Sequence, residues 1–264
     1  EVGEGVKSVK PGDRVTVNPL IYCGKCHYCR TGQYVMCTKL GTAGFAWDGA
    51  FAELGVFPEY GVLKIPDGVS DDAGAFVEPL AVAVHAVKRA RLKIGASVAV
   101  VGAGPIGLLV MQAARAAGAG KVFVIEPLKG RRELAAKTGA TAVFDPTQGD
   151  AGKAIGDLTD GLRADWAFDC VGNQASFDTA VKVTGRRAVI CIVGLAMKPI
   201  EVPFIRLWGH EKEIVFSSGY EDEFPAAIEY LADGRVNVEP LITARIKVDD
   251  LQLRRLAGIL TLVP

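Results

Sequence analysis

Four of the six cysteines lie close together, as Cys23, Cys26, Cys29 and Cys37, in the pattern C-x2-C-x2-C-x7-C. Thiolates on one short loop can converge tetrahedrally on a zinc ion, and a site closed by four sulfurs keeps no open position for chemistry. Two disulfides are the alternative. They belong to oxidising compartments, and the first residues of the chain do not have the pattern of a secretory signal. The spacing also differs from that of bacterial iron-sulfur clusters. The sequence therefore predicts a structural zinc site.

A glycine-rich turn follows a short β-branched run that starts at Ser97, and an apolar segment follows the turn. Its glycines have the spacing G-x-G-x-x-G. Gly102 permits the tight turn, Gly104 lets the backbone approach a pyrophosphate, and Gly107 lets the helix pack on the strand. The N-terminus of the helix offers its free N–H groups to phosphates. We therefore predict a dinucleotide-binding site here.

Glu126 ends the next strand-like run, KVFVI, nineteen residues after Gly107. A carboxylate at this place is expected to accept the ribose hydroxyls of the adenosine half, and it favours NAD because a 2'-phosphate would face its negative charge. Two like charges about 4 Å apart repel by about 4 kcal/mol at an effective dielectric constant near 20. Arg131 and Arg132 could neutralise such a phosphate or could be solvated helix charges.

Glu78 stands directly before Pro79 and an apolar run, so the sequence predicts that a helix begins at Glu78. From the residues alone, Glu78 is either a metal-binding or catalytic acid or a charge that favours the start of the helix. His85 lies seven residues later, about 10.5 Å along the helix, which is too far for both side chains to bind one ion. We interpret His85 as a packed core residue.

Strand-like and helix-like segments alternate from residue 97 to residue 218, with six strands, which predicts an α/β fold with a Rossmann doubly wound parallel sheet. Loops that follow the strands then face the cofactor. Cys170 and Cys191 end apolar runs, where a thiol usually packs in the core. The predicted cofactor-binding residues are Gly102, Gly104, Pro105, Ile106, Gly107, Glu126, Pro127, Arg131, Cys170, Val171, Gly172, Val193, Gly194 and Leu195.

Length and composition limit the classes of function. The chain has 264 residues, which fits two domains of about 150 residues or one large domain. Thirty Lys and Arg residues balance thirty Asp and Glu residues, so no basic field is available for nucleic acid or an anionic membrane. We expect no membrane span, and we expect a cytoplasmic enzyme.

Four segments together resemble the zinc-dependent medium-chain alcohol dehydrogenases. They are KPGDRVTV, the four-cysteine loop, VEPLAVAVHA, and VGAGPIG followed by Glu126. The Glu-Pro pair at Glu78 resembles the polyol and 2,3-butanediol dehydrogenase branch. The resemblance implies part of a β-rich, GroES-like catalytic domain at residues 1–79, an NAD-binding domain at 80–218, and a return segment of the catalytic domain at 219–264.

The resemblance also implies chemistry. In that family a catalytic zinc polarises a secondary alcohol, diol or polyol, and hydride passes to NAD, with Glu78 as a carboxylate of the zinc site. The family's catalytic Cys and His would lie upstream of Glu1, so we read the chain as N-terminally truncated and expect no complete catalytic zinc in it. A zinc-stabilised NAD-binding module without turnover is the alternative function.

Three further expectations come with this reading. We expect a homodimer or homotetramer. The loop at 41–49 either lines a substrate pocket or is a structural Ω-loop. The tail from Leu251 departs from the closing helix and strand of the family.

Overall fold

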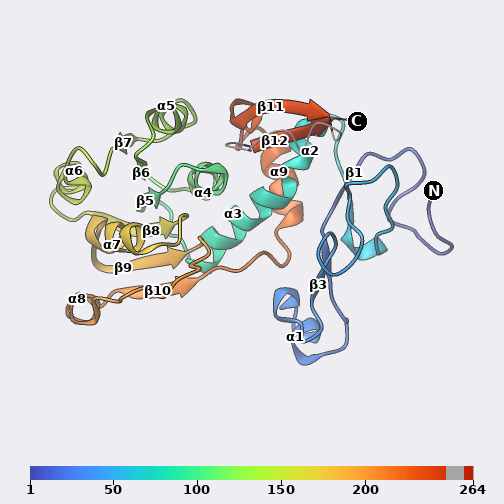
Figure 1. The fold of residues 1–264 in the computed structure, drawn as a ribbon, viewed down its shortest axis with the longest axis horizontal. Coiled ribbons are helices and arrows are strands. Elements are labelled where there is room, and N and C mark those ends of the chain that lie inside the picture. Colours follow the sequence, from blue (N-terminus) through green and yellow to red (C-terminus); the bar gives the residue numbers. More distant parts are fainter. Residues whose placement is uncertain (248–258, 264) are drawn as a thin grey trace. The chain divides into compact units, whose positions relative to one another are not determined.

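The computed structural model describes residues 1–247 and 259–263. The chain forms two compact units (Figure 1). Unit 1 contains residues 1–81, 219–234 and 242–264, and unit 2 contains residues 82–218 and 235–241. Helix α3 (Val77–Arg89) begins in unit 1 and continues in unit 2.

Unit 2 contains one parallel sheet of six strands in the order β10-β9-β8-β5-β6-β7. This order reverses direction at β5, which is the doubly wound topology predicted from the sequence. Figure 1 shows the helices of this unit lying against the sheet. The strands are β5 (Ser97–Val101), β6 (Lys121–Ile125), β7 (Ala142–Phe144), β8 (Ala164–Asp169), β9 (Thr184–Ile192) and β10 (Glu213–Phe216). The helices are α4 (Pro105–Ala116), α5 (Lys129–Lys137), α6 (Ala151–Asp157), α7 (Gln174–Val183) and α8 (Phe204–Gly209).

The core of unit 2 lies between the sheet and its helices. Phe123 and Phe168 come from β6 and β8, Ile155 and Val183 come from α6 and α7, and all four are fully buried. The β-branched and aromatic runs form strands because both faces of a parallel sheet are covered. His85 and Cys191 are buried as predicted, with exposed fractions of 3% and 0%.

Unit 1 has short elements and small sheets. Strand β1 (Val15–Val17) pairs antiparallel with β4 (Val62–Lys64), and β2 (Leu20–Ile21) pairs antiparallel with β3 (Gly41–Thr42). The helices wholly within this unit are α1 (His27–Arg30), α2 (Asp71–Ala75) and α9 (Phe224–Ala232). Short 3-10 helices lie at Tyr34–Met36, Glu59–Gly61 and, in unit 2, Glu239–Leu241.

The predicted tail falls partly outside the described residues, because 248–258 and 264 are not described. Residues 259–263 form strand β12 (Ile259–Val263), which pairs parallel with β11 (Ile242–Lys247). A closing strand is therefore present in this part of the tail, contrary to expectation. The expected departure from the family's closing helix lies on residues outside the described part.

The predicted start of the helix at Glu78 agrees with the structure to within one residue. Helix α3 begins at Val77, and the amide N–H of Leu80 donates to the carbonyl oxygen of Phe76. The chain reaches α3 directly from α2, so Glu78 lies inside the first turn and Pro79 follows it. Proline is tolerated there because the first turn needs no N–H at that position.

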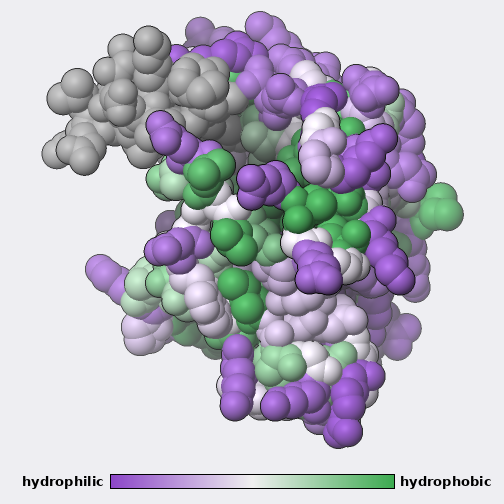
Figure 2. All heavy atoms as spheres, turned by 90° about the vertical axis from the view of Figure 1, so that its right-hand side faces the viewer, coloured by the Kyte–Doolittle hydropathy of each residue, from purple (hydrophilic) through white to green (hydrophobic). Residues whose placement is uncertain are grey.

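The surface mixes polar and apolar residues. Figure 2 shows hydrophilic residues over most of one face, with hydrophobic residues gathered between them. No helix in the described part of the chain is long and apolar enough to span a bilayer.

Candidate functional site

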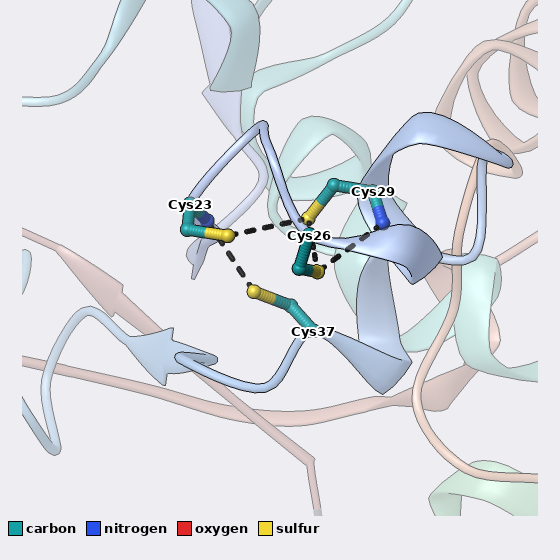
Figure 3. A group of neighbouring side chains, drawn as sticks. All are labelled: Cys23, Cys26, Cys29 and Cys37. Carbon is teal, nitrogen blue, oxygen red and sulfur yellow. Dashed lines mark hydrogen bonds between the residues drawn. The ribbon is translucent and has the colours of Figure 1, made fainter.

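The four clustered cysteines point their sulfurs at one another (Figure 3). The Sγ atom of Cys29 lies 3.5 Å from that of Cys26 and 4.0 Å from that of Cys23, and all four sulfurs lie within 4.8 Å of one another. A tetrahedron with Zn–S bonds of about 2.3 Å has sulfurs about 3.8 Å apart. The set therefore fits zinc, and its spacing is much longer than a disulfide bond of about 2.05 Å. All six cysteines are free thiols.

Backbone amides favour thiolates in this loop. The N–H groups of Cys29 and Thr38 lower the pKa of Cys26 to about 6, and N–H groups of Lys25 and Cys26 lower the pKa of Cys23. Burial instead raises the pKa of Cys29 to about 12. A bound cation removes this conflict because it stabilises all four thiolates at once.

The glycine turn joins β5 to α4 as the spacing predicts. Gly102 has a φ of +93°, which glycine adopts without strain. A Cβ atom on Gly107 would lie 1.9 Å from the carbonyl oxygen of Gly102, so only glycine lets the helix approach the turn this closely. Gly104 caps the N-terminus of α4, and Pro105 begins the helix. The phosphate site is predicted at the free N–H groups of this helix start.

Glu126 is 3% exposed at the end of β6, and both of its carboxylate oxygens accept backbone hydrogen bonds. Oε2 accepts from the N–H of Ala103 at 2.8 Å, and Oε1 accepts from the N–H of Leu128 at 2.9 Å. Glu126 therefore also holds the glycine turn, a role that the sequence reading missed. Each oxygen keeps a second lone pair for a ribose hydroxyl.

The two arginines after Glu126 differ in their contacts. The guanidinium of Arg132 donates to the carbonyl oxygens of Glu126 and Pro127, and it pairs with Asp145 at 3.0 Å. Arg131 lines the cavity beside the turn. Of the two, only Arg131 lines this cavity, so the prediction that it binds the cofactor concerns a residue in the right place.

A cavity of about 680 Å³ opens at the carboxyl ends of the parallel strands. Five predicted cofactor-binding residues line it, namely Gly102, Glu126, Pro127, Arg131 and Val171. The sequence reading missed several other residues on its wall, and their place directly after β7 and at the start of α7 could have identified them. They include Pro146, Thr147, Asn173, Ser176 and Thr179.

Asp169, at the end of β8, organises the two predicted loops beyond the sheet. Its Oδ1 atom accepts from the N–H groups of Val171 and Gly172, and its Oδ2 atom accepts from the hydroxyl of Ser176. Its backbone carbonyl accepts from the N–H groups of Val193 and Gly194. This fully buried acid was not predicted, although it ends an apolar strand, as Glu126 does.

The remaining predicted residues lie around these loops. A Cβ atom on Gly172 would lie 2.7 Å from the backbone of Gly194, so the two loops touch. Burial raises the pKa of the Cys170 thiol well above its ordinary value, which keeps that thiol protonated. Leu195 is 84% exposed, and Ile106 follows Pro105 in α4.

Glu78 is half-buried in unit 1. Burial raises the pKa of its carboxyl, and the hydroxyl of Tyr220 opposes that shift. Within the described residues, the four cysteines are the only group of three or more potential metal ligands that come together. Glu78 can thus supply one metal ligand, and it does not by itself form a metal site.

The loop at 41–49 is compact and ordered by its own contacts. The N–H of Gly44 donates to the carbonyl oxygen of Trp47, whose ring covers Gly41. Phe45 at its tip is 93% exposed. These contacts are those of a self-packed loop, as in the structural alternative.

Two family models match the chain. The alcohol dehydrogenase GroES-like domain matches residues 1–67, and the zinc-binding dehydrogenase model matches residues 105–233. The chain is 36% identical over 257 residues to sorbitol dehydrogenase of Bacillus subtilis, across 95% of this chain and 72% of that protein.

Solved structures agree with this match. A Sinorhizobium meliloti protein assigned as a zinc-binding dehydrogenase, bound to NADP, superposes with a TM-score of 0.94 at 30% identity, covering 100% of this chain and 80% of that chain. The 2R,3R-butanediol dehydrogenase of Bacillus subtilis superposes with a TM-score of 0.88 at 35% identity. The match covers 95% of this chain and 71% of that chain.

Proposed function

Because the chain belongs to the zinc-dependent medium-chain alcohol dehydrogenase family, we propose that it oxidises a small secondary alcohol, diol or polyol with NAD. The carbinol carbon gives a hydride to the nicotinamide ring, the hydroxyl group loses its proton, and a ketone and NADH result. The observation that carries this proposal is the cavity of unit 2, which Gly102 of the glycine turn and buried Glu126 line, and which supports a dinucleotide site there.

The residues of this chain contribute binding and order. The N-terminus of α4 receives the pyrophosphate, and Asp169 fixes the loops at 171–172 and 193–194 beside the cavity. The cysteine site would hold a zinc ion that stabilises the fold and has no open position for substrate. We assign Glu78 to the reaction site, as the resemblance implies.

Activity is tested with the full-length protein loaded with zinc, NAD and a panel that includes sorbitol, xylitol and 2,3-butanediol. We expect NADH absorbance to rise with at least one of these alcohols. Sorbitol and 2,3-butanediol are the substrates named for the relatives above, and those relatives support turnover over a non-catalytic module. A protein that binds NAD but reduces none of it with any diol or polyol would instead be the zinc-stabilised module.

We propose NAD rather than NADP as the working cofactor, although one structural relative was solved with NADP. The buried charge of Glu126 supports this choice, because a 2'-phosphate would face it at close range. Glu126→Ala is expected to lower the ratio of kcat/KM for NAD to that for NADP by about a hundredfold or more. An unchanged ratio would contradict the proposal.

The matched control for this change is Glu133→Ala. Glu133 lies on α5 in an exposed ion pair with Lys129 at 3.8 Å, and it does not line the cavity. The control removes one negative charge from the same region. Its ratio of kcat/KM for NAD to kcat/KM for NADP should therefore equal that of the unaltered protein.

We also propose that the enzyme is a homo-oligomer. Strand β10 is an edge of the sheet, and three large side chains of α8 next to it in sequence are exposed: Phe204 at 74%, Ile205 at 76% and Trp208 at 70%. A second copy related by a two-fold axis could cover both features, because a strand edge is self-complementary under that symmetry. Light scattering should give at least twice the mass of one chain, and Trp208→Glu should reduce that mass.

A further inference from the structure

Three tyrosine rings pack together beside the cysteine loop in unit 1. The ring of Tyr22 contacts both of the others, with its centroid 4.3 Å from that of Tyr34 and 4.3 Å from that of Tyr60. The planes of Tyr22 and Tyr34 are 23° apart, so these two rings are stacked, and the ring of Tyr60 is tilted from that of Tyr22 by 35°. The dinucleotide site does not use these rings, because its cavity is lined by residues of unit 2.

The stacked pair joins the two ends of the cysteine loop. Tyr22 directly precedes Cys23, the first of the four sulfur ligands. Tyr34 begins the 3-10 helix before Cys37, the fourth ligand, and its carbonyl oxygen accepts from the N–H of Cys37 at 3.0 Å. The N–H of Cys23 in turn donates to Sγ of Cys37 at 3.3 Å, across fourteen residues of sequence. A ring contact and a backbone contact therefore hold the same two ends.

The third ring attaches the stack to the β1–β4 sheet of unit 1. Tyr60 lies in the 3-10 helix directly before β4, and its hydroxyl oxygen accepts from the N–H of Tyr22 at 3.3 Å. Strand β4 pairs with β1, and the carbonyl oxygen of Gly61 accepts from the N–H of Asn18 at 2.7 Å. The position of Tyr22 is therefore set from the sheet as well as from the loop.

The two inner cysteines have a local constraint of their own. Cys26 caps helix α1, and its Sγ atom accepts from the N–H of Cys29 at 3.5 Å. One helical turn thus sets the distance between this pair. Cys23 and Cys37 are too far apart in sequence for one turn to do the same, and the stacked rings provide the constraint that the backbone lacks.

We propose that Tyr22, Tyr34 and Tyr60 are positioning residues for the zinc site, and that they hold Cys23 and Cys37 together before the metal binds. This inference rests on the zinc site proposed for the four cysteines. Binding of a metal by a flexible loop loses the conformational entropy of bringing the ligands together. A stack that already closes the ends of the loop removes part of this loss, so it raises the affinity for zinc.

The first test measures the zinc affinity of the whole protein by competition with a chromophoric chelator. Tyr34→Leu removes the stacked ring, and the Kd for zinc should rise about threefold to tenfold, which is the contribution of one aromatic pair. Tyr34→Phe keeps the ring and should bind zinc as tightly as the unaltered protein. An unchanged Kd in Tyr34→Leu, or an equal loss in Tyr34→Phe, would overturn the inference.

The matched control is Tyr28→Leu. Tyr28 lies on α1 in the same loop, is 39% exposed, and has its ring edge-on to His27 with centroids 5.5 Å apart. This change removes the same type of side chain outside the stack, so its Kd for zinc should equal that of the unaltered protein. A loss as large as that of Tyr34→Leu would show that any tyrosine of the loop matters equally and would contradict a role specific to the stack.

A measurement without metal separates positioning of the ligands from the strength of their bonds to zinc. With Cys26 and Cys29 both replaced by serine, Cys23 and Cys37 are the remaining thiols of the loop. Glutathione disulfide oxidises this pair to one S–S bond and is itself reduced to two glutathione molecules, and the equilibrium constant reports the effective concentration of one thiol at the other. Adding Tyr34→Leu should lower this constant about threefold to tenfold.

The outcomes distinguish the stack from the zinc site. An equal glutathione constant with and without Tyr34→Leu would overturn the inference even where zinc binds to the four cysteines. If the unaltered protein and Cys29→Ser contain the same amount of zinc, the zinc site itself fails, and the stack then has no ligands to position. NADH fluorescence should report unchanged binding by unit 2 in every variant, which shows that the rest of the chain is folded.

Discussion

The cysteine loop at 23–37 and the six-stranded sheet are held together by different forces. The loop has one α-helix of four residues and one 3-10 helix of three, and its buried side chains are Cys29 and Cys37. The sheet buries a continuous apolar core that includes Phe123 and Phe177. The sheet can therefore fold by burying apolar surface, whereas the loop needs a metal ion to bring four thiolates together. The dinucleotide-binding unit and the cysteine loop thus rest on separate sources of stability.

The largest expected effect comes from removing the metal. Cys29→Ser should lower the zinc content by about one ion per chain and make the loop at 23–37 sensitive to proteases, because structural zinc contributes about 10 kcal/mol or more to folding in isolated zinc peptides. Metal analysis and limited proteolysis measure both outcomes. Dinucleotide binding by unit 2 should persist.

Cys191→Ser is the matched control, since Cys191 is a fully buried thiol in β9 outside the loop. Its zinc content should equal that of the unaltered protein. Equal zinc content in Cys29→Ser would refute the four-cysteine site, and loss of dinucleotide binding in Cys29→Ser would show that the two regions are not independent.

An intermediate effect is expected from the core of the sheet. Phe168→Ala removes a fully buried ring and should lower the free energy of unfolding by about 3–5 kcal/mol. Denaturant unfolding measures the change, with zinc content as a second readout that should stay constant. Phe45→Ala, at a side chain that is 93% exposed, is the control and should leave the unfolding midpoint in place.

The smallest expected effect is a pH dependence in unit 2. The Lys212 ammonium donates to the carbonyl oxygens of Val181 and Thr184 and to the hydroxyl of Thr184. Burial, with Arg206 and Arg163 nearby, lowers the pKa of Lys212 from 10.5 to about 8. The folded state therefore loses this proton at lower pH than the unfolded state, and the contribution of Lys212 to stability rises between about pH 8 and pH 10.5.

Lys212→Met removes this titration. The difference in unfolding free energy between the unaltered protein and Lys212→Met should grow in favour of the unaltered protein over that pH range, by less than about 1 kcal/mol because the side chain is partly exposed. Lys198→Met, at an exposed lysine, provides the baseline. A constant difference from pH 8 to pH 10.5 would show that the proton on Lys212 is not coupled to folding.

Much of unit 2 was predictable because sequence patterns within short segments specify its strands, helices and glycine turn. Alternating strand and helix patterns gave the six-stranded doubly wound sheet, and the spacing of Gly102, Gly104 and Gly107 placed the turn at the end of β5. The start of α3 was also predicted to within one residue, because Pro79 favours the first turn of a helix.

The amino-acid sequence by itself determined the groups that carry chemistry: four thiols at zinc spacing, a glycine turn, and an acid at the end of the following strand. Each depends on residues within a few tens of positions, where geometry follows from local dihedral angles. Only the tertiary structure decided that Asp169 fixes the loops at both 171–172 and 193–194 and that Glu126 holds the N–H of Ala103. Such partners lie on separate segments, and the path of the folded backbone, which no local pattern contains, brings them together.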